Sequence, residues 1–244
     1  IELRAQALIG LGNARYTNRN HQSNTVWYLE ALDLLGECGD IELRAQALIG
    51  LGNARYTNRN HQSNTDWYQE ALRVLGDHGD INLRAQALIG LGNARYTDKS
   101  HSRNDWYLKA LSLLGDHGDV ELRAQALIGL GNARYRNNDH QSNTDWYLKA
   151  LDLLGGHGDV ELRAQALIGL GNARYRDREH QSNTVWYLKA LSLLGEHGDI
   201  NLRAQALIGL GNTRHKDSNH LRNDWYLNAL SLLGEHGDIE LRAQ

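Results

Sequence analysis

An internal repeat constrains the fold of this chain more than any other feature of its sequence. The 16-residue segment IELRAQALIGLGNARY begins at Ile1 and returns five more times with small changes, at intervals of 39 or 40 residues. Self-similarity at such a period is the sequence signature of solenoids and related repeat architectures. We therefore predict a single solenoid of six units and the start of a seventh, with the bounds 1–40, 41–80, 81–119, 120–159, 160–199, 200–238 and 239–244.

A second, longer period lies over the first. The third and sixth units are one residue shorter than the others and share the sequences INL and RNDWY, so the pattern also repeats after 119 residues. This indicates that a block of three units was duplicated. The chain opens and stops at the same point of the unit, and no terminal unit has the polar outer face that finite solenoids need. We expect a section of a longer array, or a protomer that stacks end to end.

Each unit is expected to hold two helices. In the first unit, residues 1 to about 16 place Leu3, Ala7, Leu8 and Leu11 at helical spacing. In every later unit an aspartate precedes this helix and is expected to cap it, namely Asp40, Asp80, Asp119, Asp159, Asp199 and Asp238. The second helix holds the Trp-Tyr pair and ends at a glycine.

The one-residue deletion in the shorter units predicts where the second helix begins. His61 lies six positions before Trp67, whereas His101 lies five before Trp106. A deletion inside a helix would rotate everything beyond it by about 100°. We therefore expect a loop around residues 61–65 and a helix that begins just before the tryptophan.

Two glycines interrupt the first helix of every full unit. Gly10 and Gly12 each cost about 1 kcal/mol relative to alanine in a helix interior. Their recurrence predicts that a neighbouring helix packs closely against them. A single unit leaves an apolar face on both helices uncovered, so we expect the units to fold only when they are stacked.

The unit resembles a tetratricopeptide repeat of the longer, roughly 40-residue kind. Leu11, Gly12 and Asn13 resemble the Leu-Gly signature of that family's first helix, and Tyr28 and Ala31 match its aromatic and small residues in the second helix. The Gly-Asp pair before each unit resembles the long-repeat arrays of bacterial signalling and scaffold proteins.

The unit also departs from that family. Arg15 replaces the tyrosine of the first helix, Asn24 replaces a small residue of the second, and the proline near the end of the unit is missing. The resemblance implies an all-α, right-handed α-solenoid superhelix whose first helices line the concave side. It also implies partner binding without catalysis.

Composition and charge exclude several functions. A formal net charge of -3 gives no reason to expect nucleic acid or an anionic membrane surface as a partner. No apolar run approaches the roughly 18 residues of a membrane span. The single cysteine, Cys38, excludes an internal disulfide framework. The chain begins with Ile1 rather than methionine, which leaves targeting and compartment open.

The sequence carries no motif for catalysis, so an enzyme is not expected. It has no phosphate-binding glycine loop, hydrolase elbow or paired carboxylate motif. The Trp-Tyr pairs lie at helical spacing with leucines and are expected in the core rather than as platforms for nucleic-acid bases.

Histidine recurs in two loops of the unit and raises the question of a metal. Imidazole suits zinc, copper or nickel, but a site needs three or four convergent ligands. The two loops are expected at opposite ends of the helix pair, so we predict no metal and no cofactor. These histidines are His21, His61, His101, His140, His180 and His220 in one loop, and His78, His117, His157, His197 and His236 in the other.

The candidate partner-binding residues are polar side chains of the first helix that do not vary. The loops and the outer stripe of the second helix have drifted between units, whereas the glutamine at position 6 and the asparagine at position 13 have not. With position 9 or 10 they form one stripe of the helix. The predicted row on the concave side consists of Gln6, Asn13, Gln46, Asn53, Gln86, Asn93, Asn132, Asn172 and Asn212.

A structural role competes with this interpretation. Asn13 either binds a partner or forms hydrogen bonds within or between adjacent units, and the sequence does not decide between the two. For the arginine at position 4 we expect a structural role, because Asp40 and Arg44 stand four residues apart and can pair.

Three functions fit these observations. The first is a scaffold for a protein or peptide partner. The second is a structural filament of end-to-end copies, since a head-to-tail contact that does not close gives a fibre. The third is a sensor array of a larger signalling ATPase, which the family resemblance allows. A scaffold would place the protein in the cytoplasm, and a fibre would place it outside the cell.

Overall fold

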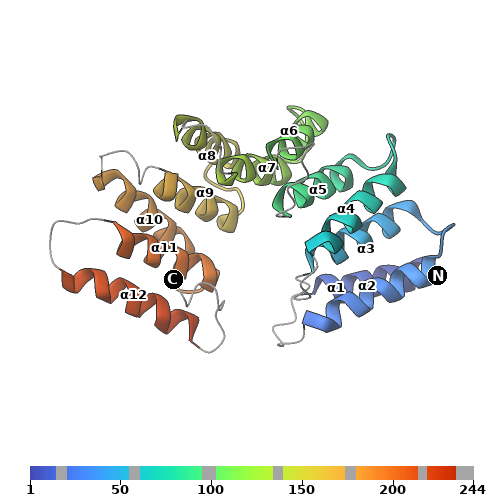
Figure 1. The fold of residues 1–244 in the computed structure, drawn as a ribbon, viewed down its shortest axis with the longest axis horizontal. Helices are drawn as coiled ribbons and strands as arrows, with labels where there is room; N and C mark the ends of the chain where they lie inside the picture. The colour runs from blue at the N-terminus through green and yellow to red at the C-terminus, as the bar shows by residue number, and fades with distance from the viewer. Residues whose placement is uncertain are drawn as a thin grey trace. The chain divides into compact units, whose positions relative to one another are not determined.

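A computed structural model describes residues 1–14, 21–54, 61–94, 103–133, 140–173, 180–213 and 219–234. These residues form twelve α-helices and no strand (Figure 1). The odd-numbered helices are the first helices of the units: α1 (Glu2–Asn13), α3 (Ile41–Asn53), α5 (Ile81–Asn93), α7 (Val120–Asn132), α9 (Val160–Ala173) and α11 (Ile200–Asn212). The even-numbered helices are the second: α2 (His21–Leu35), α4 (His61–Leu75), α6 (Arg103–Leu114), α8 (His140–Leu154), α10 (His180–Leu194) and α12 (Asn219–Leu233).

The helices pack in the order of the chain. Five odd-numbered helices contact the even-numbered helix that follows them, namely α1, α3, α5, α9 and α11. The even-numbered helices α2, α4, α8 and α10 contact in turn the next odd-numbered helix. Neighbouring odd-numbered helices also touch, as α1, α3 and α5 do in turn. This is the arrangement of an all-α solenoid of tandem helix pairs, which confirms the predicted fold class.

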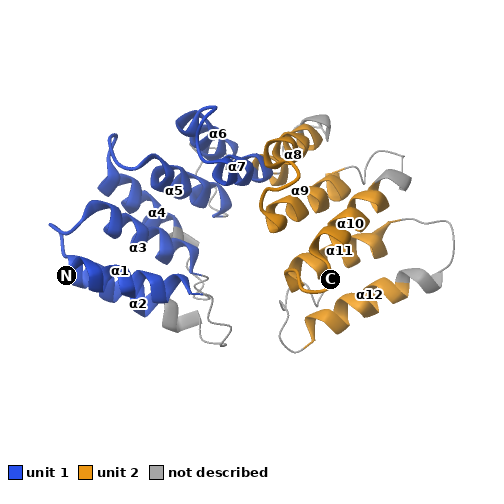
Figure 2. Cartoon of the chain, turned by 180° about the vertical axis from the view of Figure 1, so that it is seen from behind, with its two compact units in different colours: residues 1–129 blue, residues 130–244 orange. Residues whose placement is uncertain are grey.

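The chain divides into two compact units, residues 1–129 and 130–244, and the division falls within α7 (Figure 2). Each is built from the same helix pairs and is described here by itself. A single continuous solenoid and its right-handed winding therefore stay predictions.

Aspartate caps begin the odd-numbered helices. The Asp40 Oδ1 accepts a hydrogen bond of 2.8 Å from the backbone N–H of Leu43. The same bond, at 2.7–2.8 Å, confirms the predicted caps Asp80, Asp119, Asp159 and Asp199. Asp238 lies outside the described residues. At the other end of each helix pair, the glycine after the even-numbered helix has a positive φ, 59° at Gly36, a conformation that a side chain disfavours.

Two predicted helix boundaries are wrong. The odd-numbered helices end at the conserved position 13 or one residue later, not near position 16. Four even-numbered helices begin at the loop histidine, as α4 does at His61, and α12 begins one residue before it, at Asn219, rather than just before the tryptophan. Helix α6 is described from Arg103, three residues before Trp106. The deletion in the shorter units is compatible with helix there, since α12 includes both His220 and Trp225. A residue missing near the start of a helix rotates only the segment before it and leaves the packed residues beyond it in register.

A tyrosine of each even-numbered helix packs between two glycines of consecutive odd-numbered helices. The Tyr28 ring lies against Gly12 of its own unit and Gly50 of the next. A Cβ built on Gly12 would lie 2.6 Å from the ring, and one on Gly50 would lie closer still. We call this arrangement the tyrosine slot. It confirms the close packing that the glycines predict, and it recurs with Tyr68, Tyr107, Tyr147 and Tyr187.

The rest of the core consists of alanines and leucines around this slot. In the second unit Tyr68, Ala71 and Leu75 of α4 are buried with Leu83 and Leu91 of the following helix. The tryptophans are half-buried at the edge of such clusters. In three units a lysine covers the exposed side of the ring, as Lys109 does with its Nζ 4.6 Å from the centre of the Trp106 ring. The tryptophans therefore belong to the core, as predicted.

Gly50→Ala tests the tyrosine slot against a matched control in the same sequence context. The added methyl would meet the Tyr28 ring, and such overpacking costs about 1–3 kcal/mol. Gly10 has the same neighbours in sequence but no heavy atom within 4 Å of its built Cβ. We expect Gly10→Ala to gain up to about 1 kcal/mol of helix propensity. Thermal unfolding followed by circular dichroism should show opposite shifts, and equal shifts would contradict the slot.

The buried tyrosines predict a loss of stability at alkaline pH. Burial raises the pKa of the Tyr68 and Tyr147 hydroxyls far above the ordinary value, and it also raises the pKa of Tyr28. A raised folded-state pKa contributes stability that is complete below the unfolded pKa of about 10 and is lost as pH rises above it. We expect the melting temperature to fall over that range and buried tyrosinate to form only with unfolding. A single tyrosine titration near the ordinary pKa, with helicity intact, would contradict this expectation.

Candidate functional site

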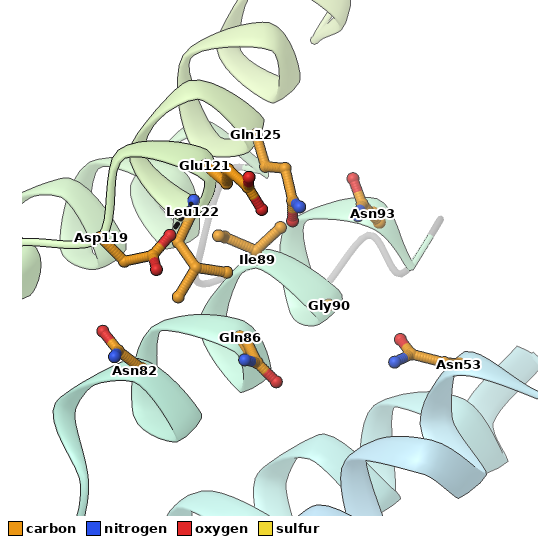
Figure 3. A pocket seen from close by; sticks show the side chains of 10 residues that line it. All are labelled: Asn53, Asn82, Gln86, Ile89, Gly90, Asn93, Asp119, Glu121, Leu122 and Gln125. Atoms are coloured by element: carbon orange, nitrogen blue, oxygen red, sulfur yellow. Dashed lines mark hydrogen bonds between the residues drawn. The ribbon is translucent and has the colours of Figure 1, made fainter. Parts of the chain in front are cut away.

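A polar cleft lies where three odd-numbered helices come together in residues 1–129 (Figure 3). It has a volume of about 390 Å³. The end of α3, one stripe of α5 and the beginning of α7 form its walls. Its lining residues are Asn53, Asn82, Gln86, Ile89, Gly90, Asn93, Asp119, Glu121, Leu122 and Gln125.

The α5 wall of this cleft is the stripe that the sequence singles out. Its five residues occupy positions 2, 6, 9, 10 and 13 of the unit and include Gln86 and Asn93. Asn53 of the preceding unit faces the same cleft (Figure 3). The structure thus brings three of the nine predicted row residues together. The other six lie outside this cleft at equivalent positions: Gln6, Asn13, Gln46, Asn132, Asn172 and Asn212.

Sequence reasoning missed part of the lining. Asn82 and Glu121 stand at position 2 of their units, four residues before the glutamine, and so on the same helix stripe. Gln125 is the equivalent of Gln86 in the next unit and was available from the repeat alone. Position 2 is asparagine in the third and sixth units and glutamate in the other four, so it is not among the unchanged residues that define the predicted row.

The asparagine of the row has a structural partner in its own unit. The Tyr28 hydroxyl donates a 2.7 Å hydrogen bond to the Asn13 Oδ1. The bond recurs at 2.7 Å in every later unit, on Asn53, Asn93, Asn132, Asn172 and Asn212. The intra-unit hydrogen bond that the sequence left open is therefore made. Because it uses the oxygen of an exposed side chain, the amide NH₂, with two donors, is the group offered outward.

The tyrosine slot thus orients the row as well as packing the units. In the first five units each tyrosine ring packs between two glycines. The tyrosine hydroxyl at the same time donates a hydrogen bond to the asparagine of its own odd-numbered helix. An asparagine side chain held by such a hydrogen bond loses less conformational freedom when it binds a partner. The row is therefore preorganised by the core.

The arginine at position 4 has a structural role, but its predicted partner is wrong. The Arg44 Nη1 donates a 2.6 Å hydrogen bond to the backbone carbonyl of Glu37, whereas the Asp40 carboxylate caps the helix. The same hydrogen bond, from Nη1 to the carbonyl oxygen seven residues earlier, is made at 2.6–2.9 Å by Arg84, Arg123, Arg163 and Arg203. A carbonyl just past the end of an even-numbered helix has no intrahelical partner, and the guanidinium supplies one.

Carboxylates and amides set the chemistry of the cleft. The Asp119 Oδ1 accepts from the N–H of Leu122 at 2.8 Å, so this carboxylate is partly used as a cap (Figure 3). Glu121 is exposed beside it. The lining residues contain no lysine, arginine or histidine. The cleft therefore offers amide donors and acceptors to a ligand, and its two carboxylates give it a negative charge.

The described residues contain no group of three or more side chains that could hold a metal ion. His78, His117, His157 and His197 lie exposed in turns. The side chains of His21, His61, His140, His180 and His220, and all of His101 and His236, lie outside the described residues. The absence of a metal site therefore stays a prediction. No helix in the described part of the chain has the length and apolar character needed to cross a membrane.

Comparison with known proteins identifies the fold. No family model matches the sequence, and no curated protein matches it. Among solved structures, the crystal structure of the apo form of RapI is similar, with a TM-score of 0.73 over 93% of this chain and 83% of that chain. The two sequences are 13% identical, so the likeness shows the fold. Together with the helix pairs described above, it establishes that the chain has the fold of a tetratricopeptide-like α-solenoid with repeats of about 40 residues.

Proposed function

We propose that this protein is a non-catalytic scaffold that binds an extended segment of a partner protein along the row of odd-numbered helices. One observation carries the proposal. The same carboxamides stand at the same positions of each unit, and four of them line an open polar cleft, namely Asn53, Gln86, Asn93 and Gln125. The tyrosine slot holds the asparagines among them in one orientation.

Amide side chains suit the backbone of an extended peptide. Each peptide unit carries one N–H donor and one carbonyl acceptor, and a carboxamide can serve both. A row that repeats with the helix pairs offers the same carboxamides in every unit. Because these bind the backbone of the partner, the side chains of the partner matter less. Recognition of this kind needs no catalytic residue and no cofactor.

The chemistry of the cleft favours a peptide over other ligands. Sites for small molecules are mostly lined by apolar and aromatic side chains, whereas eight of the ten residues here are polar or charged or glycine. Asp119 and Glu121 disfavour an acidic segment, because like charges across an interface repel. We expect the partner segment to be neutral or basic and not a nucleic acid.

End-to-end self-association is a second candidate function. It is favoured by the near-identity of the six units of the chain. Such association would give a homo-oligomer or a filament. If this were the main role of the protein, it would be a structural fibre outside the cell. A third candidate, a sensor array of a larger signalling ATPase, is supported by the family resemblance alone. A scaffold or a sensor would act in the cytoplasm.

Exchange of amides for carboxylates tests the scaffold proposal. Gln86→Glu with Asn93→Asp keeps the shape of both side chains and an oxygen for the Tyr107 hydroxyl, but removes their N–H donors. The probe is a peptide selected from random phage-displayed sequences and measured by fluorescence anisotropy. We expect binding to weaken about tenfold or more, since each lost hydrogen bond contributes about 0.5–1.5 kcal/mol.

The matched control is Gln69→Glu with Asn228→Asp. Both residues are exposed on even-numbered helices, and the pair makes the same change in net charge. We expect this variant to bind the peptide as the parent does. If no peptide is selected, or if both variants bind equally, the row does not bind a partner.

A further inference from the structure

The helices α3, α5 and α7 of residues 1–129 each begin with at least one acidic side chain. Their aspartate caps keep a carboxylate there in every unit, and position 2 adds a glutamate in α3 and α7 but an asparagine in α5. The carboxylates of Glu42 and Glu121 are exposed and form no salt bridge with a described residue. We call these acidic residues the acidic edge of the row, namely Asp40, Glu42, Asp80, Asp119 and Glu121.

The opposite end of the row offers hydrogen-bond donors. The side-chain oxygens of Asn53 and Asn93 each accept a 2.7 Å hydrogen bond from a tyrosine hydroxyl of their own unit, which leaves the NH₂ groups for a partner. Between the two ends, Gln86 and Gly90 line the cleft and carry no charge (Figure 3). A segment that crosses the helices along the row therefore meets amide donors on one side and negative charge on the other.

The distance along each helix decides which side chains of the partner can reach the acidic edge. Position 2 stands four residues before position 6, which is about 6 Å along the helix axis. A backbone that lies over the glutamine of position 6 is thus too far from the acidic edge for a short side chain. Lysine and arginine have the length and the charge that this distance requires.

The spacing of the helices decides which backbone conformation fits the row. Neighbouring odd-numbered helices touch, and the axes of packed helices lie about 8–10 Å apart. A polyproline II segment has three residues per turn and rises about 3.1 Å per residue, so it presents the same face about every 9 Å. A β-strand presents the same face about every 7 Å, and an α-helix does so about every 5.4 Å. Of these three conformations, polyproline II matches the spacing of the row.

The donors of the row also suit this conformation. A polyproline II backbone forms no internal hydrogen bonds, so its carbonyl groups remain available to a binding surface. Proline has a carbonyl but no backbone N–H, so a proline-rich segment brings acceptors without donors that need a partner. The NH₂ groups of Asn53 and Asn93 can bind such carbonyls while the asparagine oxygens stay bound to tyrosine.

We propose that the partner segment binds as a polyproline II helix with a three-residue repeat, one repeat per unit, whose basic side chain points to the acidic edge. The proposal rests on the proposed function and adds to it the conformation and the sequence period of the partner. Because the units are nearly identical, a partner with the same period makes the same contacts in each, and contacts made on one linked segment reinforce one another.

Synthetic peptides of 12 residues test the period. The probe is four repeats of Pro-Pro-Lys with a fluorescent label, measured by fluorescence anisotropy. The matched peptide has four prolines, four lysines and four prolines, so that composition and net charge are the same and the lysines are not spaced. We expect the repeated peptide to bind at least fivefold more tightly, because its lysines return at the interval of the helices. A peptide of four Gly-Ser-Lys repeats keeps the period but has no preference for polyproline II, and should bind at least threefold more weakly.

A charge-neutralising variant tests the acidic edge. Glu42→Gln with Glu121→Gln removes two carboxylates and should lower the preference for the repeated peptide over the matched one at least twofold. The control variant is Glu30→Gln with Asp33→Asn. Both of its residues are exposed on α2, and it changes the net charge by the same amount. The control should retain the preference of the parent.

Several results would overturn the proposal. These are no binding of the Pro-Pro-Lys peptide, equal binding of the two lysine-proline peptides, tighter binding of the Gly-Ser-Lys peptide, or an unchanged preference in the variant of Glu42 and Glu121. The proposed function is judged separately by the phage-selected peptide. If that peptide binds through Gln86 and Asn93 while the Pro-Pro-Lys peptide does not bind, the scaffold function stands and the polyproline II partner is wrong. If no peptide binds in either assay, both proposals are wrong.

Discussion

The insertion of a tyrosine ring between two glycines is the contact on which the rest of this structure depends. In the first five units each ring touches the odd-numbered helix of its own unit and that of the next unit, so a single side chain links three helices. The glycines weaken their helices individually by about 1 kcal/mol each relative to alanine. They are retained because a side chain there would push the ring out and separate consecutive units.

The same tyrosines connect packing to the surface. Their hydroxyls lie at the edge of the core, and each holds the oxygen of an asparagine that stands in the predicted row. The row and the core are therefore not independent features of the repeat. This explains why the asparagine has not drifted between units, whatever partner the protein binds. A structural role and a binding role use different atoms of the same amide.

Local features of the fold could be predicted from the sequence, and contacts between distant residues could not. The aspartate caps follow from a rule that acts within a few residues, and the helix-breaking glycines indicate close packing without indicating the tyrosine that supplies it. The tyrosine-to-asparagine bond joins residues 15 positions apart in the first unit, and no spacing rule points to it. The arginine was assigned to the nearest carboxylate at helical spacing, whereas its guanidinium reaches across a turn to a carbonyl.

The errors at the candidate site have the same origin. The residues of the α5 stripe lie on one side of their helix, because helical periodicity fixes this. The opposite wall, with Asp119 and Glu121, depends on how the next unit packs against it. The deletion in the shorter units does not mark the start of the even-numbered helices, because a residue missing near the beginning of a helix leaves the packed residues beyond it in register.

The arginine at position 4 donates its hydrogen bond to a backbone carbonyl of the turn, so the bond does not depend on which side chain the turn residue carries. The residue that provides the carbonyl is Glu37, Asp77, Asp116, Gly156 or Glu196, and the bond is the same in each. Substitution of that side chain therefore leaves the hydrogen bond between the arginine and the turn intact. One edge of the helix pairs can thus acquire or lose negative charge, unit by unit, while the architecture stays constant.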